Sequence, residues 1–263
     1  MSERTSYKPG TPSWVDLSTP DQEEAVEFYS ALFGWEVPES ENPEQTGGYR
    51  TATLRGQAIG GVVKLMQEGQ PAAWMTYISV KDAEETAAKV RAAGGRVILE
   101  PMDVLEIGRM AVFADPTGAV FGIWQPRAFP GAGLVNEPGA FTWNELNTRD
   151  PDAARAFYGA VFGWEPTEHE MGEMGSYVEW KQGGDPMSGM VDIRGRAPDE
   201  VPAHWLTYFA VEDTDAAVEK VGQLGGGVAF GPIDIMAGRF AVVHDPHGAM
   251  FAVIRMAEEG AAA

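Results

Sequence analysis

The sequence predicts an α+β protein made of two tandem, similar halves. Residues 13–37 and 142–166 share a Trp, an acidic residue two positions later, an FY pair and a GWE ending, at an offset of 129 positions. The segments that begin at Ala72 and Gly108 match those that begin at Ala203 and Gly238 in the same way. Within each half a Trp is followed by a Gly after 20 residues, and this interval occurs twice. Such self-similarity indicates an internal duplication into four modules.

The first module has the pattern of a strand, a helix and further strands. Residues 14–17 alternate apolar and polar side chains, and Thr19-Pro-Asp supplies a helix start. Apolar residues recur at helical spacing from Ala25 to Phe33, and Gly34 ends the helix. Residues 49–54 and 59–65 are short alternating segments on either side of Arg55-Gly56, which predicts a hairpin.

The second module repeats this order. Asp82 caps a helix that Gly94-Gly95 closes, and strands are expected at 96–99, 110–114 and 119–124. Asp115-Pro-Thr-Gly, repeated as Asp245-Pro-His-Gly, has Pro and Gly where a turn needs them. Each module therefore has the predicted order βαβββ.

The boundary between the halves is marked by composition. Residues 125–140 are rich in Pro and Gly and lack apolar periodicity, which is typical of a linker. We therefore expect a first domain over 10–127, a linker over 128–140 and a second domain over 141–257.

Charge and composition exclude several classes of function. Nineteen basic against 39 acidic residues give a net charge of −20, so nucleic acid and anionic membranes are not expected partners. There is no cysteine, hence no thiolate nucleophile, disulfide or iron–sulfur cluster. The N-terminal segment lacks the apolar stretch of a signal peptide and the apolar runs are strand-sized, so we expect a cytoplasmic protein. No P-loop, nucleophile elbow or dinucleotide fingerprint is present.

The helix ending FYxxxFGWE, the GG turn after the second helix and the segment GRxAVxxDPxGAxF resemble the glyoxalase, bleomycin-resistance and extradiol-dioxygenase superfamily, also called vicinal oxygen chelate proteins. The resemblance covers residues 12–256 and is strongest to tandem two-domain glyoxalase-like proteins of actinobacteria. It implies two tandem glyoxalase-like domains, each with two paired βαβββ modules that form a half-closed, cup-shaped barrel. In the superfamily this cup holds the ligand and usually a divalent metal.

The resemblance also locates the metal ligands of metal-using members. The first ligand stands fourteen residues before the FY pair, the second opens the second module, and the third follows the Asp of DPxG by about seven residues. The matching positions in this chain are Trp14, Trp74 or Met75, and Gly122 in the first half, and Trp143, Trp205 or Leu206, and Ala252 in the second. None of these side chains is a usual ligand, so we expect no metal cofactor.

The four repeated Trp residues allow two interpretations. Trp14, Trp74, Trp143 and Trp205 each open a module and are either core residues or aromatic walls of a ligand-binding cup. Asp16 and Glu145 share a strand face with Trp14 and Trp143 because side chains alternate along a strand. Facing the cup, they are the predicted catalytic acid or base groups; facing solvent, they are ordinary surface residues.

Two arginines are repeated as well. Arg109 and Arg239 occupy equivalent positions in the segment GRxAV. They are expected either to bind a ligand carboxylate through the planar guanidinium or to pair with Asp16 and Glu145 structurally.

Three functions remain open. The leading hypothesis is metal-independent binding of a small hydrophobic or aromatic molecule, as in the resistance proteins. The alternative is a glyoxalase-like lyase or isomerase that uses Asp16, Glu145 or a displaced metal site. The third is a structural protein whose cups are filled by its own side chains. Duplication lets a monomer be complete, and a homodimer remains open.

Overall fold

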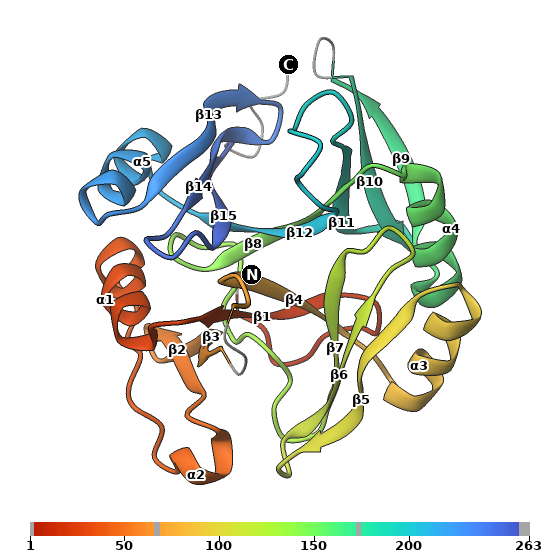
Figure 1. The fold of residues 1–263 in the computed structure, drawn as a ribbon, viewed down its shortest axis with the longest axis horizontal. Helices are drawn as coiled ribbons and strands as arrows, with labels where there is room; N and C mark the ends of the chain where they lie inside the picture. The colour runs from red at the N-terminus through yellow and green to blue at the C-terminus, as the bar shows by residue number, and fades with distance from the viewer. Residues whose placement is uncertain (1–2, 66–68, 172–174, 258–263) are drawn as a thin grey trace.

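The computed structural model describes residues 3–65, 69–171 and 175–257, which form two curled sheets, one from each half of the chain (Figure 1). The first half contains β1 (Pro12–Thr19), α1 (Gln22–Phe33), α2 (Pro43–Thr46), β2 (Arg50–Leu54), β3 (Gln57–Lys64), β4 (Ala73–Ser79), α3 (Ala83–Ala92), β5 (Arg96–Val104), β6 (Gly108–Ala114) and β7 (Val120–Pro126). The second half contains β8 (Phe141–Thr148), α4 (Pro151–Phe162), β9 (Glu165–Glu170), β10 (Ser176–Gln182), β11 (Asp185–Asp192), β12 (His204–Ala210), α5 (Thr214–Gln223), β13 (Gly227–Ile235), β14 (Gly238–His244) and β15 (Met250–Met256).

The predicted α+β class and the modular order are confirmed. The seven-stranded sheet has the order β2-β3-β1-β4-β7-β6-β5 and the eight-stranded sheet the order β13-β14-β15-β12-β8-β11-β10-β9. In each sheet the two modules meet where their first strands pair antiparallel, β1 with β4 and β8 with β12. The first module is shorter than expected, because the strand after its helix is reduced to one bridge between Glu36 and Thr53.

Local sequence signals place the ends of the helices. The Asp21 side chain accepts a hydrogen bond from the Glu24 amide, and Asp82 caps α3 in the same way. Gly34 ends α1 with φ of 76°, a left-handed conformation that costs glycine nothing. Arg55 and Gly56 have φ of 54° and 75°, as a two-residue hairpin turn requires.

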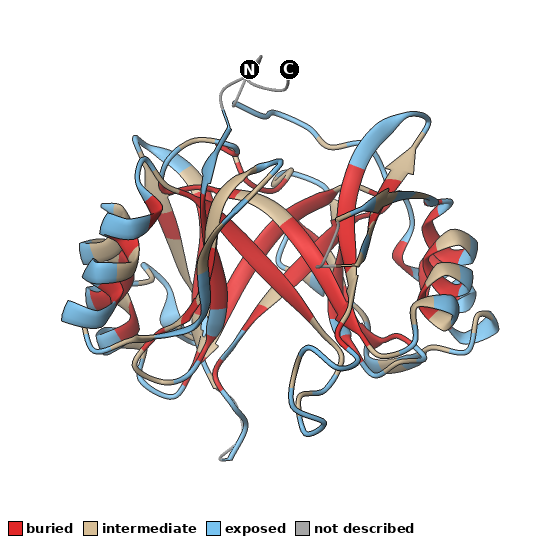
Figure 2. Ribbon diagram, turned by 90° about the horizontal axis from the view of Figure 1, so that it is seen from above, coloured by how far each residue is buried: buried red, intermediate tan, exposed pale blue. Residues whose placement is uncertain are grey.

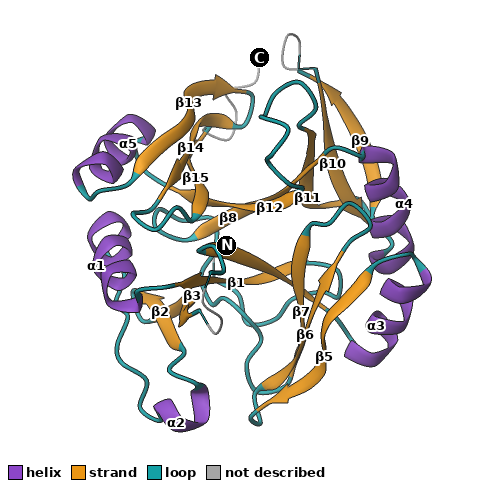
Figure 3. Cartoon of the chain, viewed as in Figure 1, coloured by secondary structure: helices purple, strands orange, loops and turns teal. Residues whose placement is uncertain are grey.

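The two sheets lie back to back, with β4 and β12 in contact at the centre (Figures 1 and 2). At this contact the Thr76 hydroxyl donates to Asn144 Oδ1 at 2.7 Å. The four longer helices lie at the two flanks, where α1 packs on α5 and α3 packs on α4, so each helix pair joins the halves (Figure 3). The convex faces are therefore buried between the halves and the concave faces point outward. In the part of the chain that is described, no helix is long and apolar enough to cross a membrane.

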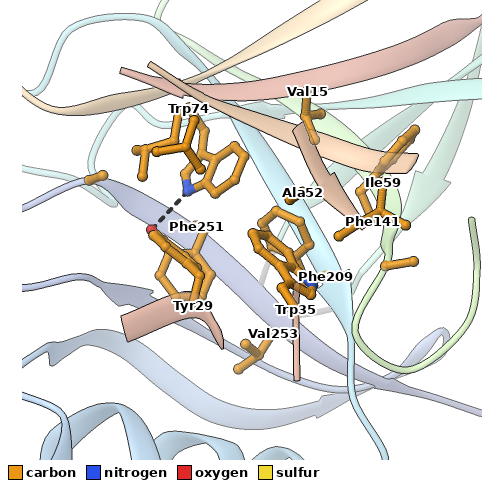
Figure 4. Close-up of a cluster of buried hydrophobic side chains, with 14 of the residues drawn as sticks. Val15, Tyr29, Trp35, Ala52, Ile59, Trp74, Phe141, Phe209, Phe251 and Val253 are labelled. Atoms are coloured by element: carbon orange, nitrogen blue, oxygen red, sulfur yellow. Dashed lines mark hydrogen bonds between the residues drawn. The ribbon is translucent and has the colours of Figure 1, made fainter. Parts of the chain in front are cut away.

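A buried hydrogen-bond chain joins the halves on one flank. The Tyr29 hydroxyl of α1 donates to Asp245 Oδ2 of the second half at 3.1 Å and accepts from Trp74 Nε1 at 3.0 Å (Figure 4). The other carboxylate oxygen of Asp245 accepts the backbone amides of His247 and Ala249. Burial raises the pKa of Asp245, while these amides and the tyrosine hydroxyl act to lower it.

The duplication repeats this chain on the opposite flank. Tyr158 of α4 donates to Asp115 Oδ2 at 2.9 Å and accepts from Trp205 Nε1 at 3.0 Å. Each half thus supplies the acceptor for the tyrosine of the other. Around Tyr29 a cluster of rings from both halves fills the core, including Trp35, Phe209 and Phe251 (Figure 4).

Replacing Tyr29→Phe is expected to destabilise the protein by about 2–3 kcal/mol, because Asp245 Oδ2 and the Trp74 indole N–H both lose the tyrosine hydroxyl as a partner. The measurement is urea denaturation of both proteins. Tyr7→Phe is the matched control, since the Tyr7 hydroxyl bonds only the Ala132 carbonyl. Equal losses in the two variants would contradict the structural role of the chain.

Candidate functional site

The concave face of the first sheet carries a buried acidic residue between two tyrosines. Trp14 Nε1 donates to the Tyr49 hydroxyl at 2.7 Å, and that hydroxyl donates to Asp16 Oδ2 at 3.4 Å. Tyr77 of β4 also hydrogen-bonds the Asp16 carboxyl. We call these four residues the first cluster.

The second sheet holds the same arrangement, with Glu in place of Asp. Trp143 Nε1 donates to the Tyr177 hydroxyl at 2.8 Å, and the Tyr208 hydroxyl donates to Glu145 Oε1 at 3.0 Å. Tyr177 hydrogen-bonds Glu145 as well. These four residues are the second cluster, and Asp16 and Glu145 are each only 6% exposed.

Glycines on the neighbouring strands make room for the tyrosines. A Cβ atom on Gly61 of β3 would overlap the Tyr49 hydroxyl, and one on Gly189 of β11 would overlap the Tyr177 hydroxyl. Gly61 pairs with Asp16, and Gly189 pairs with Glu145, so each glycine lies directly beside the acid. The absent side chains are what allow a phenol to reach the carboxyl.

The environment makes both acids weak. Burial raises the pKa of Asp16 to about 7, although the Tyr77 and Tyr49 hydroxyls act to lower it. Burial likewise raises the pKa of Glu145 to about 7, against the lowering effect of Tyr208 and Tyr177. The pKa of Tyr77 and of Tyr208 is raised well above its usual value, first by burial and then by the adjacent carboxyl. Near neutral pH each acid can therefore donate or accept a proton.

The structure places two of the four repeated tryptophans on the concave faces and two in the core. Trp14 and Trp143 lie on the concave faces. Trp74 pairs with Leu17, and Trp205 with Leu146, so these two tryptophans share the opposite face and are buried in the core between the halves. The strand register decides this, because residues directly opposite on paired strands point to the same side. Trp74 and Trp205 are therefore core residues and do not line a concave face.

The structure pairs the two arginines with other acidic residues than Asp16 and Glu145. Arg109 forms ion pairs with Glu84 and Asp103, at 2.9 and 3.0 Å. Arg239 forms equivalent pairs with Asp215 and Asp234, at 2.8 and 3.1 Å. They do not pair with Asp16 or Glu145. Both arginines instead tie the start of a helix to a β-hairpin, and all four acidic partners are largely exposed.

The sequence-based prediction missed the tyrosines. Tyr77 and Tyr208 follow Trp74 and Trp205 by three residues, and Tyr49 and Tyr177 each follow a glycine-containing turn segment. Their recurrence in both halves is the signal that could have identified them, since helical or strand periodicity does not separate a site tyrosine from a core tyrosine.

The residues of the concave faces do not fit the metal site of metal-using members. Met75 lies opposite Asp16 and Leu206 opposite Glu145, at the positions of the second ligand. Within residues 3–65, 69–171 and 175–257, no three His, Cys, Asp or Glu side chains gather as a metal would require. One carboxyl on each face is not enough to hold a divalent ion.

A surface hollow lies apart from both clusters. It has a volume of about 190 Å³ and is bordered by residues at the start of α4 and on or just beyond β10 and β11, including Asp152, Arg155 and Asp192. No member of either cluster lines it.

The fold and the paired clusters agree with a family comparison. The model of the Glyoxalase/Bleomycin resistance protein/Dioxygenase superfamily matches residues 11–123 and again 140–253. The chain belongs to this superfamily, as two tandem domains.

Individual relatives extend over the whole chain. CFP32 of Mycobacterium bovis, a protein provisionally named as a glyoxylase, is 42% identical over 98% of this chain and all of its own length. The anthracycline biosynthesis protein DnrV of Streptomyces peucetius is 38% identical over 97% of this chain and 96% of its own.

Solved structures share the fold at low identity. The Mn(II)-bound glyoxalase of Novosphingobium aromaticivorans superposes with a TM-score of 0.64 at 15% identity, over 97% of this chain and 83% of that one. The 2,3-dioxygenase LapB of Pseudomonas sp. KL28 gives 0.66 at 15% identity, over 95% and 93%.

The raised pKa of Asp16 predicts a dependence of stability on pH. The folded state holds the proton more tightly, so this contribution is complete below the ordinary pKa of 3.8 and is lost as pH rises through about 7. Between pH 4 and pH 8 the loss is on the order of 3 kcal/mol for this group. Denaturation of wild type and Asp16→Asn across this range should show a smaller decline in the variant. Parallel pH profiles would disprove the assignment.

Gly189→Ala is expected to displace Tyr177 and to cost about 1–3 kcal/mol of stability, because the new methyl group overlaps the phenol. Gly159→Ala in α4 is the control, since the nearest atom to its Cβ is the Trp164 carbonyl oxygen at 3.4 Å. Thermal denaturation of both variants measures the difference. A Gly189 variant as stable as the Gly159 variant would show that the site tolerates the methyl group.

Proposed function

We propose that the protein binds a small hydrophobic or aromatic molecule against a Trp-lined concave face, without a metal ion. The observation that supports this most directly is the repeated cluster of one buried acid, two tyrosines and one tryptophan. Binding sites for small molecules are mostly apolar and use a few polar groups to orient the ligand.

The walls of the second concave face fit this ligand class. Leu206, Tyr208, Ala252 and Ile254 form an apolar cluster against which the half-exposed Trp143 and Phe240 pack. An aromatic ligand could stack on these rings, and a polar group on it could exchange a proton or hydrogen bond with Glu145. The name of DnrV, which refers to anthracycline biosynthesis, is consistent with a small-molecule ligand.

The residues at the usual metal-ligand positions support binding without a metal ion. The positions that bear metal ligands in metal-using members carry Trp, Met, Leu, Gly and Ala, which offer at most a weak thioether donor. The solved relatives with metal chemistry share only the fold at 15% identity, so their chemistry does not transfer to this chain.

The pKa of the two acids favours a second candidate function, a glyoxalase-like isomerase or lyase. A carboxylate with a pKa of about 7 can remove a proton from the carbon next to a carbonyl group and return it to the neighbouring carbon. The tyrosine hydroxyls would donate hydrogen bonds to the oxygen on which charge develops. This reaction needs no oxidant or metal.

Fluorescence titration with N-phenyl-1-naphthylamine, an uncharged aromatic probe, tests the binding proposal. In buffer containing EDTA we expect saturable binding with a Kd in the micromolar range, about −8 kcal/mol. Adding Mn²⁺, Zn²⁺ or Ni²⁺ should leave the Kd unchanged. Absence of saturable binding, or binding that requires a metal, would overturn the proposal.

The isomerase candidate is tested on the same protein with methylglyoxal and a thiol in EDTA-containing buffer. Turnover that falls at least 100-fold in Glu145→Gln or Asp16→Asn would support catalysis by that acid. Turnover equal to that of the uncatalysed reaction would leave binding as the only candidate of the two.

A further inference from the structure

The two concave faces differ at one aromatic ring. Phe129, in the segment between the halves, packs edge-on against Trp14 with ring centroids 4.9 Å apart and against Trp124 at 6.1 Å. Its carbonyl accepts a hydrogen bond from Trp124 Nε1 at 2.8 Å, and its amide donates to the Ile107 carbonyl at 3.0 Å. The ring is therefore held over the tryptophan of the first cluster.

The segment that carries Phe129 is fixed to the rim of the first sheet. The Ala132 amide donates to the Ser13 carbonyl at 2.8 Å, and the Gly133 amide donates to the Ala58 carbonyl at 2.7 Å. A side chain on Gly131 would overlap the Ser13 carbonyl oxygen, which shows how closely the segment approaches β1. In Figure 1 this segment runs from the end of β7 up to β8 across the concave side of the first sheet.

The second half has no equivalent ring in its sequence. Ile254 stands at the position of Trp124, and Glu259 stands at the position of Phe129.

Two matched wall positions are more exposed on the second face, while Leu206 of the second face is less exposed than its counterpart Met75. Trp14 and Val112 are buried, whereas their counterparts Trp143 and Val242 are only half-buried. The apolar wall of the second face forms a cluster of its own, while the first face is continuous with the main core through Phe129 and Trp124.

The second face also has a buried donor that the first lacks. Asn147 shares its strand face with Trp143 and Glu145, where the first half has Ser18. The Asn147 residue is more than nine-tenths buried, and its amide hydrogen-bonds the Glu145 carboxyl. An amide N–H₂ group carries two donors, so the bond to Glu145 leaves a second N–H for the oxygen of a ligand or a water.

We infer that the second concave face is the ligand site and that Phe129 closes the first. The ligand class is an aromatic molecule that carries a hydroxyl or carbonyl oxygen, with its ring against Trp143 and its oxygen accepting from Asn147 Nδ2. One molecule binds per chain. This inference rests on the proposed binding function and specifies where it takes place.

Stoichiometry tests the location of the site. Titration of the full chain with N-phenyl-1-naphthylamine should give one site per chain, and Phe129→Ala should give two. Tyr177→Phe should weaken the single site at least fivefold, whereas the matched variant Tyr49→Phe should leave it unchanged.

The outcomes separate the two proposals. Two sites in the wild type, or a loss caused by Tyr49→Phe and not by Tyr177→Phe, would overturn the inference while the binding function stands. No saturable binding in any variant would overturn the binding function itself. The Tyr49 and Tyr177 variants decide the matter even where Phe129→Ala fails to fold.

The chemistry of the ligand is tested with a pair of probes. Asn147→Ala should weaken the binding of 1-naphthol about tenfold, which corresponds to the loss of one hydrogen bond of about 1.4 kcal/mol. The Kd of naphthalene should change by less than about twofold. Equal losses for the two probes would show that Asn147 acts only through packing and would overturn its role as donor.

Discussion

The arrangement of the molecule depends on the reciprocal hydrogen bonds that cross between its halves. Tyr29 donates to Asp245, and Tyr158 donates to Asp115, so one oxygen of each buried carboxylate is hydrogen-bonded by the opposite half. Each aspartate also terminates a tight turn by accepting backbone amides, which couples the turn geometry of one half to a helix of the other. Removing either partner leaves a buried charge or donor unpaired, a larger penalty than the net gain from a typical hydrogen bond.

The convex faces are buried where the two halves meet. Because side chains alternate along a strand, the residues that stabilise this contact and the residues of the candidate site lie on opposite faces of the same strand. On β1, Val15 and Leu17 are fully buried between the sheets, while Trp14 and Asp16 face the concave side. The same division places Trp74 in the core and Tyr77 beside Asp16. Two residues of one strand can thus serve different purposes without conflict. The pKa of each acid is raised to about 7 because burial removes it from water. The packing that forms the site therefore also sets the pH range in which the acids exchange protons.

Duplication produces two sites of similar construction, but a tandem chain has only one linker between its halves. That linker lies against the first sheet and carries Phe129 to Trp14 and Trp124. In our interpretation the first concave face then serves stability, which is the structural role considered from the sequence, and the second retains the binding role. The two hypotheses therefore apply to different halves of one molecule.

The sequence by itself determined the α+β class, the four modules, the helix ends at Asp21 and Gly34, and the family. These features follow from short-range periodicity, capping residues and internal repetition, all of which can be read along the chain. It also placed Asp16 beside Trp14 on the face of one strand and Glu145 beside Trp143 on the face of another. Only the tertiary structure decided which tryptophans face the core, because the register of β1 with β4 fixes the side to which Trp74 points. It alone brought Tyr77 of β4, Asp16 of β1 and Tyr49, the residue before β2, together, and it placed Arg109 among exposed acids, since such contacts between distant positions leave no local pattern.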